Sequence, residues 1–142
     1  MSLLLLINQL PYHRTLLDTA DALVARQPAV ALVTAHMACE IYVEQIMSAA
    51  FTKRGVAELE DSITELFPSN NLANERIRNV YVALTGDRIQ EAAFWARFKE
   101  SSSLRNQAVH HGARVSPDQG RAACAVAREL VAHLDSITGA LH

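Results

Sequence analysis

The chain has 142 residues, of which 50% are hydrophobic and 20% are charged, a composition typical of a globular protein and not of a disordered one. At this length we predict a single domain spanning residues 1–142, with one hydrophobic core. The formal net charge of −2 argues against a general nucleic-acid coat protein, which would be strongly basic.

Neither the N-terminus nor the cysteines indicate a membrane or an oxidising compartment. Residues 3–7 are apolar, but this run is too short to span a bilayer and lacks the basic start of a signal peptide. Cys39 and Cys124 lie in apolar helical patterns without a CxxC spacing, which favours buried reduced thiols over a disulfide or metal pair. We therefore expect a cytoplasmic protein without membrane contact.

Apolar residues recur at helical spacing and nothing alternates with a period of two, so the sequence predicts an all-α fold. A first long helix is expected over residues 12–26, ended by Gln27 and Pro28. A second, over 29–53, is the most apolar and should lie at the centre of the molecule.

Shorter helices are expected in the second half of the chain. The first covers 56–67 and is ended by Pro68, and the second covers 72–85 with Asn70 or Asn71 as N-cap. A third covers 87–99 and is capped by Asp87, and a fourth begins with an N-cap among Ser101–Ser103 and ends at Gly112. The last helix runs from Ser116-Pro117 to residue 138. The aromatic residues Phe94, Trp95 and Phe98 could stack on bases, but their helical spacing favours core packing. Residues 3–10 are left without an assigned conformation. Together these elements predict an up-and-down helical bundle of four or five main helices.

A polar stripe interrupts the second helix, where His36, Glu40 and Glu44 follow one another at i, i+4 steps. A solvated edge is the favoured interpretation. A metal site would need ligands from other helices. In the third interpretation Glu40 is partly buried and orients a cation elsewhere in the chain, because a buried carboxylate needs a cationic partner.

The residues with the clearest chemistry are Arg105, Asn106, His110 and His111. Arginine binds phosphate through a planar fork of donors, and histidine transfers protons near neutral pH. Asn106 and His110 share one helix face, whereas Arg105 and His110 lie about 140° apart on an ideal helix. Arg105 and His110 can therefore meet at one substrate only if Arg105 reaches round the helix or a second copy of the helix completes the site.

Basic residues are enriched around this motif. Between residues 97 and 121 lie Arg97, Lys99, Arg105, Arg114 and Arg121, against only Glu100 and Asp118. Such a local excess of positive charge suits a polyanion, so we include Arg114 and His111 as candidate substrate-binding residues.

The run Arg105-Asn106, three residues, then His110 resembles the signature of the HEPN superfamily, and the resemblance extends over residues 11–138 of an all-helical chain. It implies a metal-independent endoribonuclease without a cofactor, acting on RNA as a homodimer with the site at the interface. Arg105, Asn106 and His110 would be the catalytic residues, and Glu40 would orient Arg105 or a histidine. A toxin or phage-defence context, with a possible cognate antitoxin, is also implied.

One position departs from the family pattern. Members that are paired with nucleotidyltransferases carry a tyrosine two residues after the histidine, where this chain has Gly112. This difference argues against neutralisation by nucleotide modification at that position. The alternative to a ribonuclease is a non-catalytic helical module that binds RNA, nucleotides or proteins, in which Arg105 and His110 only brace the bundle or a dimer interface.

Overall fold

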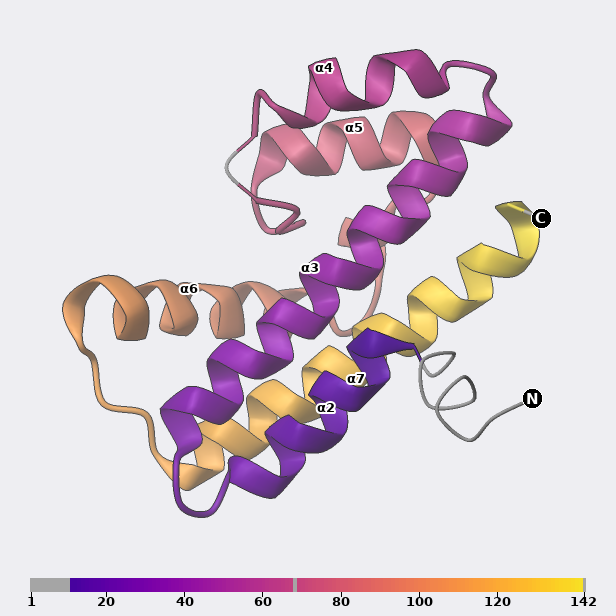
Figure 1. Ribbon diagram of the computed structural model, residues 1–142. Coiled ribbons are helices and arrows are strands. Elements are labelled where there is room, and N and C mark those ends of the chain that lie inside the picture. Colours follow the sequence, from indigo (N-terminus) through magenta and orange to yellow (C-terminus); the bar gives the residue numbers. More distant parts are fainter. Residues whose placement is uncertain (1–10, 68, 142) are drawn as a thin grey trace, which may run out of the picture.

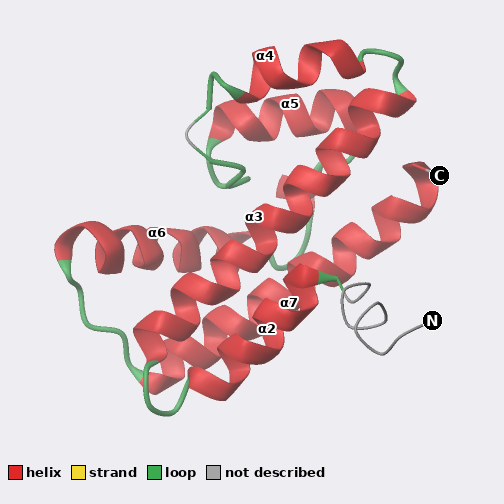
Figure 2. Cartoon of the chain, in the orientation of Figure 1, coloured by secondary structure: helices red, strands yellow, loops and turns green. Residues whose placement is uncertain are grey.

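The computed structural model describes residues 11–67 and 69–141, and within these ranges the chain forms helices and no strand, which confirms the all-α class (Figures 1 and 2). The elements are α2 (Tyr12–Leu23), α3 (Pro28–Lys53), the 3-10 helix η1 (Ala57–Leu59), α4 (Glu60–Thr64), α5 (Glu75–Thr85), the 3-10 helix η2 (Ile89–Glu91), α6 (Trp95–His111) and α7 (Pro117–Leu141). The apolar run 3–7 lies outside the described residues. No described helix is long and apolar enough to cross a membrane.

Helix α3 lies at the centre, as its apolar sequence predicts, with α2 and α7 packed along it (Figure 1). Its buried residues surround the helix and do not follow one stripe, which is expected of a helix covered on several sides. Ion pairs fix the directions of its neighbours. Arg14, at the start of α2, pairs with Asp135 late in α7, and Arg128, earlier in α7, pairs with Asp21 late in α2, so α2 and α7 are antiparallel.

The remaining helices cover the two ends of α3. Figure 1 shows α4 and α5 beside the C-terminal end of α3, while α6 lies across α3 and its C-terminal end projects to one side of the molecule in this view. Phe94, Trp95 and Phe98 are buried, which confirms that this aromatic cluster belongs to the core. Cys39 and Cys124 are free and buried, as predicted.

Two predicted boundaries around α6 are wrong. Residues 87–99 do not form one helix, because the short η2 precedes a turn and α6 begins only at Trp95. The helix then continues through Ser101–Ser103 without a break. The serines do not cap a new helix because two of their hydroxyls are used in the interior: Ser101 pairs with His36 and Ser102 accepts a hydrogen bond from Asn71.

Two other helix ends were predicted correctly from residues close to them in the sequence. Gly112 follows α6 with a φ of 63°, a left-handed conformation that glycine adopts without strain. Ser116 and Gln119 form the predicted reciprocal capping pair at the start of α7, with distances of 3.1 and 2.9 Å. By contrast, the predicted N-cap of α5, Asn70 or Asn71, is wrong. The N-cap is Asn74, whose side chain accepts from the backbone amides of Arg76 and Ile77.

Candidate functional site

Arg105 lies on the side of α6 that faces α3, and its side chain is only partly exposed. One terminal nitrogen, Nη1, donates to Oδ1 of the neighbouring Asn106 at 3.3 Å. The Nε atom is buried and has no hydrogen-bond partner. The guanidinium is therefore held against the protein, with one donor that the surrounding residues leave unused.

Glu40 of α3 lies close enough to Arg105 for their charges to interact. Burial raises the pKa of the Glu40 carboxyl, and the positive charge of Arg105 acts in the opposite direction. No hydrogen bond joins the two side chains, since Oε1 of Glu40 is also buried without a partner. The structure thus brings together the pair that the third interpretation of the polar stripe requires, while the orienting role of Glu40 stays a prediction.

The interpretation of the whole stripe as a solvated edge is wrong for His36, whose side chain is 2% exposed. Its Nε2 atom lies 2.8 Å from the Ser101 hydroxyl of α6. Burial, assisted by the charge of Arg105, lowers the pKa of His36 to about 4, so the imidazole is neutral at physiological pH. Only Glu44, the last residue of the stripe, is exposed.

No metal centre is found around this stripe or elsewhere in residues 11–67 and 69–141: no group of three or more histidine, cysteine, aspartate or glutamate side chains converges there. His36 is committed to Ser101, and Glu40 lies beside a cation. Both features suit a buried polar contact between α3 and α6 better than a ligand set.

His110 and His111 occupy the last turn of α6, and both are exposed. No hydrogen bond to either ring is found in the described part of the chain, so both imidazoles are accessible to a ligand. Asn106, one turn before His110, accepts a hydrogen bond from Arg105 through its side-chain oxygen Oδ1. Arg114 is also exposed, in the segment between α6 and α7.

The motif residues therefore fall into two groups within one subunit. Arg105 faces α3 beside Glu40, whereas His110 and His111 face solvent at the end of the same helix. This division follows from the angular separation of Arg105 and His110 on a helix. A single chain thus presents a positioned guanidinium and exposed imidazoles on different sides of α6.

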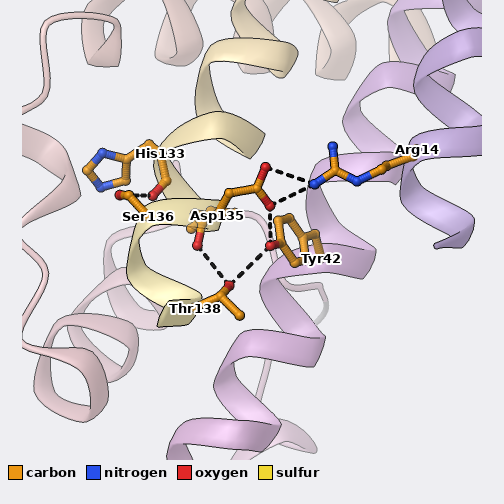
Figure 3. Close-up of polar contacts among 7 residues, drawn as sticks. Arg14, Tyr42, His133, Asp135, Ser136 and Thr138 are labelled. Carbon is orange, nitrogen blue, oxygen red and sulfur yellow. Dashed lines mark hydrogen bonds and ion pairs between the residues drawn. The ribbon is translucent and has the colours of Figure 1, made fainter. Parts of the chain in front are cut away.

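Two further polar clusters were not anticipated from the sequence. In the first, Asp135 of α7 accepts hydrogen bonds from Arg14 of α2 at 2.8 and 2.9 Å and from the Tyr42 hydroxyl of α3 at 2.5 Å, and Tyr42 also contacts Thr138 (Figure 3). Burial raises the pKa of Asp135, but the hydrogen bonds from Tyr42 and Arg14 outweigh it and the net shift is downward. This cluster joins three helices and contains no unpaired nucleophile.

The second cluster centres on Asp87, whose Oδ2 atom accepts from the Tyr81 hydroxyl at 2.6 Å and lies 2.8 Å from Nε2 of His133. Figure 3 shows that the Ser136 hydroxyl lies near His133, but it donates to the backbone carbonyl of that residue, not to its ring. The histidine–carboxylate pair therefore lacks a serine nucleophile. No sequence motif links these residues, which are up to 52 positions apart and meet only through packing.

Comparison with known proteins gives no relative from which a role can be transferred. No family model matches the chain, and neither a curated protein nor a solved structure matches it. The family resemblance of the α6 motif therefore rests on the residues Arg105, Asn106 and His110 and on the helical fold around them.

Proposed function

We propose that this protein is a metal-independent endoribonuclease of the HEPN type, active as a homodimer in the cytoplasm. The observation that carries the proposal is the end of α6, where two exposed imidazoles follow a guanidinium already held in place against α3. A positioned cation and free proton carriers are the groups that cleavage of an RNA phosphodiester requires.

The proposed reaction uses the 2′-hydroxyl of RNA as the nucleophile. His110 takes the proton of this hydroxyl while its oxygen attacks the phosphorus. The bond to the 5′-oxygen then breaks, and this leaving oxygen receives a proton from His111 or from the partner's His110. Arg105 stabilises the negative charge that grows on the non-bridging oxygens. The products are a 2′,3′-cyclic phosphate and a 5′-hydroxyl.

Burial around Arg105 supports its assignment to the phosphate. Its Nε atom is buried and its Nη1 atom donates to Asn106, so the guanidinium is held in place while part of the side chain stays exposed to a phosphate. Asn106, which already contacts Arg105, would keep the fork oriented and contribute a further donor through its amide. His111 and Arg114 extend the exposed polar surface along which the RNA strand would run.

The dimer in this proposal follows from the geometry of one subunit. Arg105 and His110 lie on different sides of α6, and of the two ways to unite them we propose the one in which a second subunit brings its own histidine to the first subunit's arginine. A toxin or phage-defence setting, with a cognate antitoxin, would suit such a nuclease because its activity must be restrained in the cell.

A non-catalytic helical module is the second candidate, and the same separation of Arg105 from His110 favours it. In that case Arg105 serves to compensate the charge of Glu40 where α3 meets α6, and the histidines only terminate the helix. Such a module would bind a partner without cleaving RNA.

The deciding experiment incubates purified protein with mixed RNA in excess EDTA and identifies the ends of the products. We expect cyclic phosphate and 5′-hydroxyl ends, with the rate reduced roughly 10²–10⁴-fold in His110→Ala and a comparable loss in Arg105→Ala. Arg76→Ala, which removes an exposed cation of α5 outside the motif helix, serves as the matched control and should retain activity. Cleavage that survives both motif substitutions, or no cleavage by the wild type, contradicts the proposal.

A further inference from the structure

A small cavity opens next to Glu40, on the side of α3 that faces the segment between α4 and α5. Its volume is about 240 Å³, and it is lined by Met37, Glu40, Ile41, Glu44, Ser69 and Asn70. Because Glu40 both lines this cavity and interacts with the charge of Arg105, the cavity adjoins the proposed phosphate-binding residue.

Residues 69 and 70, which form one wall of the cavity, lie next to a residue that is hydrogen-bonded to α6. The next residue, Asn71, is buried, and its side-chain amide nitrogen donates to the Ser102 hydroxyl of α6 at 2.8 Å. Its side-chain oxygen Oδ1 accepts from the backbone amide of Ala73 at 3.0 Å. The cavity is therefore bounded by α3 on one side and, on the other, by a segment that is hydrogen-bonded to α6.

The chemistry of the cavity combines apolar walls with acceptors. Met37, whose side chain is 41% exposed, and Ile41 supply apolar surface, and a methionine thioether packs well on aromatic rings. The carboxylates of Glu40 and Glu44 accept hydrogen bonds and donate none when ionised. Oε1 of Glu40 is buried without a hydrogen-bond partner, whereas the side chain of Glu44, which also lines the cavity, is exposed and open to a ligand.

We infer that this cavity binds the base of a nucleotide next to the cleaved phosphate and prefers guanine; this inference rests on the proposed ribonuclease function. Guanine presents two adjacent donors on its Watson–Crick edge, N1–H and N2–H, which one carboxylate can accept together. Its O6 acceptor can receive a hydrogen bond from the Asn70 amide. Uracil presents one donor between two carbonyl oxygens, which the carboxylates repel.

A basic side chain of a protein partner is the other ligand that carboxylates attract. The apolar side chains of Met37 and Ile41 favour an aromatic ring over a strongly hydrated ammonium group. The neighbouring guanidinium of Arg105 also repels a cation and attracts the phosphate that every nucleotide carries.

The test measures binding of the 3′- and 5′-monophosphates of guanosine, adenosine, cytidine and uridine to the full-length protein by calorimetry, which does not depend on cleavage. We expect a guanosine monophosphate to bind about tenfold or more tightly than the uridine nucleotide, as a bidentate contact to one base predicts. Glu44→Gln and Glu40→Gln should abolish this preference. Glu58→Gln, an exposed carboxylate outside the cavity, is the matched control and should retain it.

Equal affinity for the four nucleotides, a guanosine preference unchanged in both cavity variants, or tighter binding of agmatine than of any nucleotide would each overturn the inference. Circular dichroism of each variant checks that the helices are intact. The outcome is separable from that of the cleavage assay. RNA cleavage without base preference refutes the cavity assignment alone, whereas guanosine binding without cleavage refutes the ribonuclease alone.

Discussion

His36 is a buried imidazole whose protonation state affects the stability of the fold. Its pKa in the native state is about 4, below the value of 6.5 expected in the unfolded chain. As the pH falls from 6.5 towards 4, the unfolded state binds the proton first, so the free energy of unfolding decreases in this window. This lowering of the pKa corresponds to a loss of about 3 kcal/mol once the pH is below 4.

This loss can be isolated by comparing the wild type with His36→Gln, which keeps a polar group opposite Ser101 but does not titrate. Urea unfolding at pH 7.5, 5.5 and 4.5 should give a steeper decline for the wild type than for the variant. Identical declines would show that other groups, such as His13 or the carboxylates, account for the acid sensitivity.

His13 offers a second prediction, because it is a buried polar residue whose hydrogen bonds are not satisfied. Its ring stacks on Tyr42 with centroids 3.9 Å apart, and both ring nitrogens are buried without a partner. Burial and the nearby charge of Arg14 lower its pKa, although Asp135 acts in the opposite direction. Phenylalanine would keep the stacking and remove both unpaired nitrogens.

His13→Phe is therefore expected to raise the free energy of unfolding by about 1 kcal/mol, measured in urea at pH 7.5. His133→Phe is the matched control, since its ring contacts Asp87 at 2.8 Å and its replacement should destabilise the protein. A destabilising effect of His13→Phe would indicate that His13 forms a contact that phenylalanine cannot replace.

At the scale of the helix, two glycines should respond to alanine in opposite directions. Gly112 has a φ of 63° and ends α6, and a Cβ added there meets no atom within 4 Å. Gly112→Ala should therefore cost about 1 kcal/mol from backbone strain alone. Gly139 lies within α7 in equally open space and without a positive φ, so Gly139→Ala should stabilise by about 0.5 kcal/mol. Thermal unfolding of the two variants compares them directly, and equal signs would contradict this account.

The helices show which parts of the structure a sequence can predict. Ser116, Pro117 and Gln119 fix the start of α7 because their hydrogen bonds are local. The prediction of an N-cap among Ser101–Ser103 is wrong because the partners of Ser101 and Ser102, His36 and Asn71, lie 65 and 31 residues away. A serine suits a helix end or a buried polar contact equally well, and only packing decides between them.

The candidate site divides in the same way. Helical spacing predicts that Arg105 and His110 point in different directions, and the exposure of His110 follows from its place beside Gly112. The packing of Phe98 and Ser101 decides which side of α6 faces α3. The charge interaction between Arg105 and Glu40 could therefore be anticipated only from the need of a buried carboxylate for a cation. The cavity beside Met37 carried no signal in the sequence, because residues 69 and 70 approach α3 only in the folded chain.

At the scale of the whole molecule, the proposed site requires two subunits, and this requirement can be tested without knowing the interface. If Arg105 of one subunit acts with His110 as base and His111 as acid of the other, a mixed dimer of the Arg105→Ala and His110→Ala variants contains one composite site in which Arg105 and His110 are both intact. Its other site lacks both. Random mixing at equal concentration should therefore restore about a quarter of wild-type RNA cleavage, although each variant alone is inactive.

The measurement requires the two variants to exchange subunits, which is achieved by co-expression with different affinity tags and purification through both. Such doubly tagged dimers should then carry about half of the wild-type activity. The control pairs the double variant Arg105→Ala/His110→Ala with the wild type. In this mixed dimer neither composite site has both groups, so we expect no activity. If the site were contained in one subunit, the wild-type subunit would keep half of the activity. Failure of the two single variants to restore each other, together with activity in this control, would place the reaction within one chain. Arg105 would then have to leave Glu40 and reach round α6 to His110.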